Sequence, residues 1–151
     1  MPIYMNLSNL PGASLDKRYE GWHEIHAFSW GASNPGSITQ GGKVMFSDFS
    51  VTMSASKSAS KIMLAVATGK HLEKGIVAVT NGQGAEVSRY TFDLLMLNSF
   101  SQSHSNGEIG PPYMSLSWQF RKVTYRIGIP RADGSFAYET NFWDLSTNTG
   151  G

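Results

Sequence analysis

Most of the chain alternates between hydrophobic and polar residues with a period of two, which is typical of strands with one buried face. Two long runs show the pattern most clearly. The apolar phase of the first run contains Tyr90, Phe92, Leu94 and Met96, and that of the second contains Met114, Leu116, Trp118 and Phe120. Both runs are therefore predicted to be strands.

The alternation changes phase within two segments. Beyond residues 121–122 the apolar phase contains Val123, Tyr125 and Ile127. Within residues 44–53 the apolar phase begins with Val44 and Phe46 and then changes to Phe49, Val51 and Met53. A change of phase by one residue marks a β-bulge or a strand that passes from one sheet to another. We therefore predict a mainly β fold whose long, bent strands form a barrel or a tightly packed sandwich.

Turn-forming residues separate these runs. Residues 81–84 (NGQG) lie between two apolar runs and predict a hairpin, and Asp133-Gly134 after Pro130 predicts another. Residues 31–43 (GASNPGSITQGGK) show no periodicity and are rich in glycine, so they predict a long loop. Loops of this length inside compact domains are usually functional or disordered.

One segment is predicted to be a helix that packs beside the strands. Ser58 or Ser60 can cap its start, and Gly69 suits the position just past its end. The stripe expected to face the sheet contains Ala59, Ile62, Met63 and Val66. Leu64 falls on the polar face instead, near Lys57 and Lys61. We interpret Leu64 as a candidate contact between subunits, although a single exposed leucine is also common on ordinary surfaces.

No catalytic, cofactor or metal site is predicted. His23 and His26 are spaced i, i+3 in a strand-like segment, which places them on opposite faces, and Glu24 with His26 would need a third ligand. Residues 82–84 contain G-x-G without the helix start that a phosphate loop requires, and G-x-S-x-G is absent. Trp22, Phe28 and Trp30 are spaced as core aromatics.

Composition narrows the class of function. The chain has 151 residues, the size of a single domain spanning 1–151, of which residues 148–151 are expected to fray. Its 12 basic and 11 acidic residues give a net charge of +1, which lacks the basic excess of a nucleic-acid binder. Only 15% of residues are charged, which slightly favours an assembling surface, and cysteine is absent. The first residues (MPIYMNLSNL) do not read as a cleavable signal peptide, and no apolar run suggests membrane insertion.

The order of short motifs along the chain resembles the haemolysin-coregulated protein (Hcp) family, whose members are tube subunits of type VI secretion systems. The motifs are residues 3–5 (IYM), 21–31 (GWHEIHAFSWG), 46–49 (FSDF), 67–71 (ATGKH), 116–120 (LSWQF), 123–125 (VTY), 132–134 (ADG) and 143–145 (WDL). This resemblance implies a two-sheet closed β-barrel with one α-helix alongside and a long extended loop. It also implies homo-hexameric rings that stack into an expelled tube.

The same resemblance implies several partners and a route of export. The expected partners are further copies of the chain, the spike protein and sheath of the secretion machine, and small effector proteins carried or chaperoned in the lumen. The protein is expected to be made in the bacterial cytoplasm and secreted to the extracellular space or a target cell. The matching loop suggests a ring-stacking role for Ser33, Asn34, Pro35, Ser37, Thr39 and Gln40.

Three other functions remain open from the residues alone. A phage-like tail-tube protein would share the same assembly logic, and a monomeric β-barrel could bind a small ligand through its aromatic side chains. A hydrolase is the third, although no motif supports it.

Overall fold

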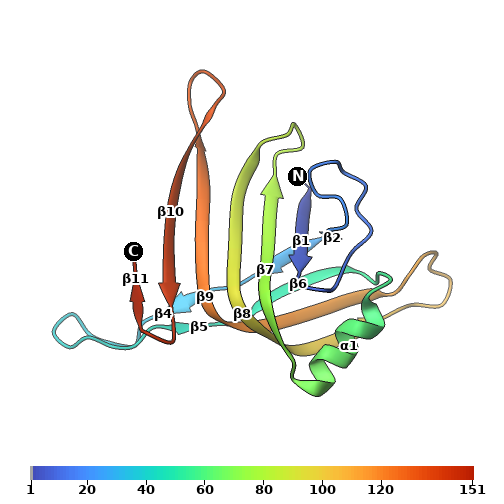
Figure 1. The fold of residues 1–151 in the computed structure, drawn as a ribbon, viewed down its shortest axis with the longest axis horizontal. Helices are drawn as coiled ribbons and strands as arrows, with labels where there is room; N and C mark the ends of the chain where they lie inside the picture. Colours follow the sequence, from blue (N-terminus) through green and yellow to red (C-terminus); the bar gives the residue numbers. More distant parts are fainter. Residues whose placement is uncertain (1) are drawn as a thin grey trace.

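The computed structural model describes residues 2–151, which form a mainly β fold with one helix (Figure 1). The elements in chain order are β1 (Ile3–Leu7), β2 (His23–Ile25), β3 (Ala27–Ser29), β4 (Ala32–Ser33), β5 (Met45–Phe46), β6 (Phe49–Ser54), α1 (Ala59–Thr68), β7 (His71–Thr80), β8 (Glu86–Ser103), β9 (Tyr113–Pro130), β10 (Phe136–Asp144) and β11 (Thr149–Gly150). Among these residues a nine-stranded sheet has the order β11-β10-β9-β8-β7-β1-β2, with β6 pairing to β9 and to β3.

The two predicted hairpins are present. β7 and β8 are joined by residues 81–85, where the Asn81 side chain accepts hydrogen bonds from the backbone N–H groups of Gln83 and Ala85. β9 and β10 are joined by residues 131–135, where Gly134 has a φ of +88°. A left-handed backbone of this kind is readily available only to glycine, so the residue fixes the turn.

Strands β8 and β9 are 18 residues long, and both bend. In Figure 1 their upper halves stand beside β7 and β10, whereas their lower halves run across the base with β6. The phase change predicted at residues 121–122 coincides with this corner. Asp93 pairs with Lys122, and the next pair is Leu95 with Phe120, so Leu94 and Arg121 lie opposite each other at the corner in an unchanged register.

The matching phase change in β8 was missed in the sequence. Leu94 has a φ of +54° and is 37% exposed, whereas Leu95 and Leu97 are buried. The prediction that Leu94 and Met96 lie in the core is therefore wrong. The register between β8 and β9 does not change at this corner, so the buried phase switches in both strands together, and the register shift lies further along, between Leu97 and Ser99.

The predicted two-sheet closed barrel is not shown by the strand pairing. β2 pairs with β1, and β3 pairs with β6, but β2 and β3 are separate short strands with His26 between them. The segment 44–53 is likewise divided. β5 pairs with β4 in a small second sheet, and β6 joins the main sheet, because Ser47 and Asp48 interrupt the strand.

Helix α1 begins after Ser58 and ends at Gly69, as predicted, but its details differ. The Ser58 hydroxyl donates to the Pro11 carbonyl instead of capping the helix. Met63 is 47% exposed, and Ala65 takes the buried position beside Ile62. Because α1 covers only the end of the sheet where β8 runs past it, its buried stripe is narrower than the pattern suggested.

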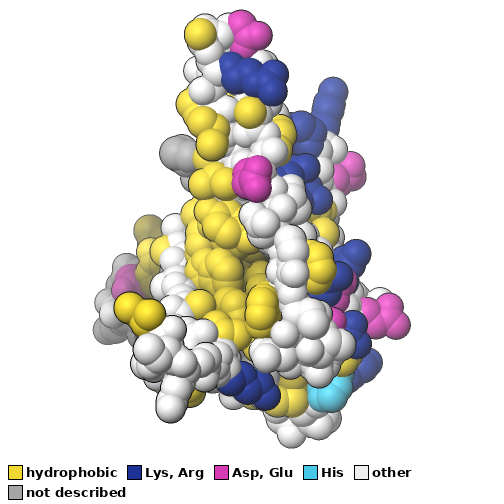
Figure 2. Space-filling model, turned by 90° about the vertical axis from the view of Figure 1, so that its left-hand side faces the viewer, with side chains coloured by type: hydrophobic (Ala, Val, Ile, Leu, Met, Phe, Trp, Pro, Cys, Tyr) yellow, Lys and Arg dark blue, Asp and Glu magenta, His cyan; other side chains and the backbone are white. Residues whose placement is uncertain are grey.

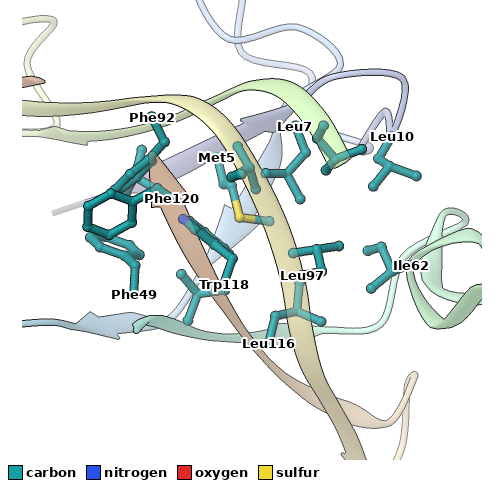
Figure 3. Close-up of a cluster of buried hydrophobic side chains, with 14 of the residues drawn as sticks. Met5, Leu7, Leu10, Phe49, Ile62, Phe92, Leu97, Leu116, Trp118 and Phe120 are labelled. Carbon is teal, nitrogen blue, oxygen red and sulfur yellow. The ribbon is translucent and has the colours of Figure 1, made fainter. Parts of the chain in front are cut away.

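The core lies between the upright strands and the base, and α1 closes one end (Figure 3). Its fully buried aromatic side chains are Phe49, Phe92 and Trp118. Rings of Phe49 and Trp118 stack with centroids 5.1 Å apart, and Phe92 meets both edge-on. The Met114–Phe120 and Phe49–Met53 alternations are confirmed as core strands.

The last residues pair with β10, and the fraying expected of residues 148–151 stays a prediction. Thr149 and Gly150 form β11 against Asp144 and Trp143. Gly151 and Phe142 also exchange backbone hydrogen bonds in both directions, at 3.0 and 3.2 Å. The tight turn at residues 145–148 returns the chain to β10, so the terminus adds an edge strand.

Candidate assembly surfaces

A hairpin arm projects from the body. It comprises residues 32–46, with β4 and β5 at its base, and extends to the left in Figure 1. All six side chains proposed from the sequence for ring stacking are exposed; they are Ser33, Asn34, Pro35, Ser37, Thr39 and Gln40. The segment 31–43 is therefore a protruding arm of defined path that makes few contacts with the core.

Two of these side chains shape the arm. Asn34 accepts a hydrogen bond from the Gly36 N–H at 2.8 Å and donates one to the Gly42 carbonyl at 3.3 Å. Ser37 accepts from the Gln40 N–H at 3.0 Å. Because Asn34 and Ser37 bond within the arm, the groups left for another molecule are concentrated at its tip, where Ile38 is fully exposed.

Aromatic stacking fixes the root of the arm to the core. Trp30 and Phe46 lie one on each side of the hairpin base and stack with planes 8° apart. Trp30 also meets Tyr90 edge-on at 5.6 Å, and Phe46 meets Phe120 edge-on at the same distance. The arm therefore leaves the body in a direction set by buried side chains.

A second surface is an apolar sheet face that the chain leaves partly uncovered. Ile3, Val79 and Ile127 lie in register across β1, β7 and β9, in the same phase as the core. Along β9 that phase becomes increasingly exposed, from Val123 at 4% through Ile127 at 38% to Ile129 at 59%. Ile3 and Val79 are partly buried against the core, with buried Ser88 between Val79 and Ile127, and we call the exposed pair Ile127 and Ile129 the open apolar face.

A surface view from one side (Figure 2) shows where hydrophobic side chains gather on the molecule. Figure 2 looks at the side that carries β4, β5, β10 and β11, and it shows hydrophobic side chains gathered in a continuous band between polar margins. A contiguous apolar area with a polar rim is typical of a surface that another protein covers. The sequence had placed Ile127 in an apolar phase but gave no sign that it would be 38% exposed.

The outer face of the same sheet carries a charged network. The Glu86 carboxylate accepts two hydrogen bonds from Arg89, one from Arg126 at 2.7 Å and one from the Tyr19 hydroxyl at 2.9 Å. The Tyr138 hydroxyl donates to the Glu86 backbone carbonyl at 2.9 Å. These bonds tie the loop that contains Tyr19 to three strands, β8, β9 and β10.

Electrostatics in this network favour the ionised carboxylate. Burial by itself would raise the pKa of Glu86, but the hydrogen bonds from Arg89 and Tyr19 and the charge of Arg126 outweigh it and lower the pKa. Burial, followed by the hydrogen bond to Glu86, raises the pKa of Tyr19 to about 12. The network stabilises the fold by linking the loop to the strands.

The histidines considered as metal ligands do not converge. His23 is buried and donates from Nε2 to the Leu10 carbonyl at 2.7 Å, whereas His26 is exposed and bonds to the Ser54 hydroxyl at 3.2 Å. Within residues 2–151 no three His, Asp or Glu side chains gather as a metal-binding group. Burial lowers the pKa of His23 and outweighs the opposing effect of its bond to Leu10.

A groove lies beside the helix. Its volume is about 360 Å³, and it separates α1 from the end of β1 and the start of β7. Its apolar floor contains the buried Leu10 and Leu72, and the exposed Leu64, Lys61 and Lys70 stand at its rim. Leu64 is 57% exposed, so the exposure expected from the sequence is confirmed, whereas its contact with another subunit stays a prediction.

No helix among residues 2–151 is long and apolar enough to span a membrane.

The profile of the family described as "Type VI secretion system effector, Hcp" matches residues 4–126. No curated protein sequence matches the chain.

Several solved structures share the fold. A chain described as a type six secretion system protein has a TM-score of 0.90 at 24% identity, with 99% of both chains covered. Hcp1 from Salmonella typhimurium has a TM-score of 0.84 at 20% identity, with 99% of this chain and 97% of that chain covered. A type VI secretion system effector from Yersinia pestis has a TM-score of 0.80 at 15% identity, with 94% and 98% covered.

Proposed function

The chain belongs to the Hcp family of type VI secretion system effectors, and from this premise we propose that it is the tube subunit of such a machine. In this role it forms homo-hexameric rings, and the rings stack into a tube that the machine expels. The protein has no catalytic role, requires no cofactor and binds no nucleic acid.

The open apolar face carries this proposal. A monomer that left Ile127 and Ile129 in water would lose the free energy that burial of such side chains provides, about 25 cal/mol per Å². In a cyclic assembly each copy covers this face of its neighbour, and closure stops the pairing from continuing without limit. Edge strands such as β11 are protected in the same way.

Closure of the barrel is part of the proposal. β2 and β3 are separated by His26 alone, and the His26 N–H donates to the Thr52 carbonyl of β6 at 2.8 Å. This bond continues the ladder between β3 and β6 toward β2. We infer that β2 and β3 act as one bent strand that connects β1 to β6.

The arm and the helix supply further contacts between copies. The exposed tip of the arm, with Ser33, Asn34, Pro35, Ser37, Thr39 and Gln40, reaches from one ring to the next. Uncharged hydrogen-bonding groups suit this task, because burying them costs less than burying charge. Leu64 on α1 contacts a neighbouring subunit.

The remaining partners follow from the family. The tube carries the spike protein at its end, slides inside the sheath and holds small effector proteins in its lumen. The chain is made in the bacterial cytoplasm and leaves with the expelled tube. One domain, residues 1–151, performs these tasks.

Light scattering after size exclusion tests the assembly, and negative-stain images test the ring. A hexamer mass and six-fold rings are expected at micromolar concentration. The double variant Ile127→Ser/Ile129→Ser should reduce the hexamer, whereas the control Ile38→Ser, at the arm tip, should retain it. A wild-type protein that remains monomeric would rule out the proposal.

A further inference from the structure

The groove beside α1 combines an apolar floor with an unbalanced positive rim. Lys61 and Lys70 line it, and no acidic residue does. Residues 49–72, which include α1, contain lysines but no Asp or Glu. In a chain whose net charge is only +1, this is a local concentration of positive charge.

Ser8 and Thr68 at the groove are already hydrogen-bonded to the Lys74 and Leu64 carbonyls, but three other side-chain donors there have no partner. Within residues 2–151 neither the ammonium groups of Lys61 and Lys70 nor the side-chain amide of Asn9 makes a hydrogen bond or ion pair. Free backbone carbonyls at the end of α1 would repel an anion. Two of them already accept hydrogen bonds within the chain: the Ala65 carbonyl from the Lys70 N–H, and the Val66 carbonyl from the Gly69 N–H. The groove therefore suits a carboxylate that stands next to an apolar side chain.

The chain itself presents such a pair. Among residues 2–151, large apolar side chains that are more than nine-tenths exposed occur at Leu15, Ile38 and Ile109. Ile109 follows Glu108 in the loop between β8 and β9, which extends to the right beyond α1 in Figure 1. No residue of this loop lines the groove in its own copy.

The other exposed residues fit less well. Asp16, next to Leu15, is occupied, because it accepts a hydrogen bond from the Tyr4 hydroxyl at 3.3 Å and lies 3.7 Å from Arg18. Ile38 has no acidic neighbour in the sequence. The Glu108 side chain is 42% exposed and has only a 3.9 Å approach to His104.

We propose that the Glu108–Ile109 loop tip of one copy docks in the groove of another, with Ile109 against Leu64 and Glu108 between Lys61 and Lys70. The inference rests on the proposed function, and it identifies the neighbouring residues that Leu64 meets. The apolar contact supplies affinity, and the charges select the orientation.

Cross-linking tests the contact directly, because the natural chain has no cysteine. Leu64→Cys and Ile109→Cys proteins are mixed under mild oxidation. A disulfide requires β-carbons roughly 3.5–4.5 Å apart, so the mixed pair should cross-link faster than either protein alone. Lys57→Cys, seven residues before Leu64 and outside the groove, is the matched control. Equal cross-linking of Ile109→Cys to Lys57→Cys and to Leu64→Cys would overturn the inference.

Charge exchange tests the pairing. The variant Glu108→Lys should raise the concentration needed for assembly by about tenfold or more, and so should the double variant Lys61→Glu/Lys70→Glu. A protein with all three substitutions should assemble at a concentration close to that of wild type, because the opposite charges face each other again. The controls Glu20→Lys and Lys57→Glu should behave as wild type.

The outcomes separate the two proposals. If wild-type protein assembles and Glu108→Lys assembles equally well, the groove serves another partner, and only this inference fails. Loss of assembly without recovery in the combined variant also overturns it. A wild-type protein that never assembles overturns both.

Discussion

Trp30 stacks on Phe46 with ring centroids 5.9 Å apart, and this pair joins the two sides of the arm at its root. Each ring also meets a core aromatic edge-on, Tyr90 and Phe120 respectively. The direction of the arm is therefore determined by the same aromatic cluster that holds the sheet together.

Phe46→Ala should loosen the arm while the sheet stays folded. Phe46 is half-buried, so the expected loss is about 1–3 kcal/mol, below the 3–5 kcal/mol of a fully buried phenylalanine. Denaturant unfolding measures this loss, and hydrogen exchange should show faster exchange in residues 32–46. Met45→Ala, at the exposed neighbouring position, is the control and should change little. Equal exchange in both variants would contradict the role of the stack.

Replacement of residues 33–40 by a short Gly-Ser linker should leave hexamers intact and abolish tubes and export. Each hydrogen bond that the arm makes is worth only about 1 kcal/mol, but several arms act together in a ring. Electron microscopy and a secretion assay measure the two results. If the shortened protein still forms tubes and is still secreted, the arm is only a connector.

Leu64→Glu should leave the monomer folded and weaken the contact between subunits. Burial of a side chain of this size contributes roughly 1.5–3 kcal/mol at each interface. Dilution followed by mass measurement detects the effect. Met63→Glu is the matched control, because Met63 is also exposed on α1 but does not line the groove. A Leu64→Glu assembly as resistant to dilution as wild type would place Leu64 in solvent.

Stability should decrease as the pH falls below about 6.5. Burial lowers the pKa of His23 in the folded chain, whereas the unfolded chain binds a proton near the ordinary value of 6.5. Protonation therefore favours unfolding on the acidic side of that value. His23→Gln, whose amide can still donate to the Leu10 carbonyl, should reduce the slope of unfolding free energy against pH between 5 and 7. The same slope in both proteins would show that another group is responsible.

The Glu86 network predicts a second loss of stability at lower pH. The pKa of the Glu86 carboxyl is lowered from 4.5 in the folded chain. The ionised carboxylate therefore stabilises the fold fully above pH 4.5, and this contribution is lost as the pH falls through the folded-state pKa. Glu86→Gln should be less stable at pH 7 and should show a smaller decrease on acidification. Glu139→Gln, an exposed carboxyl on β10, should follow wild type.

The sequence was sufficient to predict those features that depend only on neighbouring residues along the chain. Alternation identified β6, β9 and the phase change beside Arg121, because side chains on a strand must alternate between core and water. Asn81 and Gly134 identified the two hairpins through their own backbone preferences. Gly69 identified the end of α1 for the same reason.

Features that depend on residues far apart in the sequence, such as strand bends and the exposure of side chains, were visible only in the tertiary structure. The bend of β8 at Leu94 follows from its pairing with β9, and nothing in the residues around Leu94 distinguishes it from a core position. Ile127 shares the phase of Val123, yet Val123 is 4% exposed and Ile127, nearer the end of β9, is 38% exposed. Periodicity reveals which side chains face the same way, whereas only the arrangement of the whole chain determines whether anything covers them.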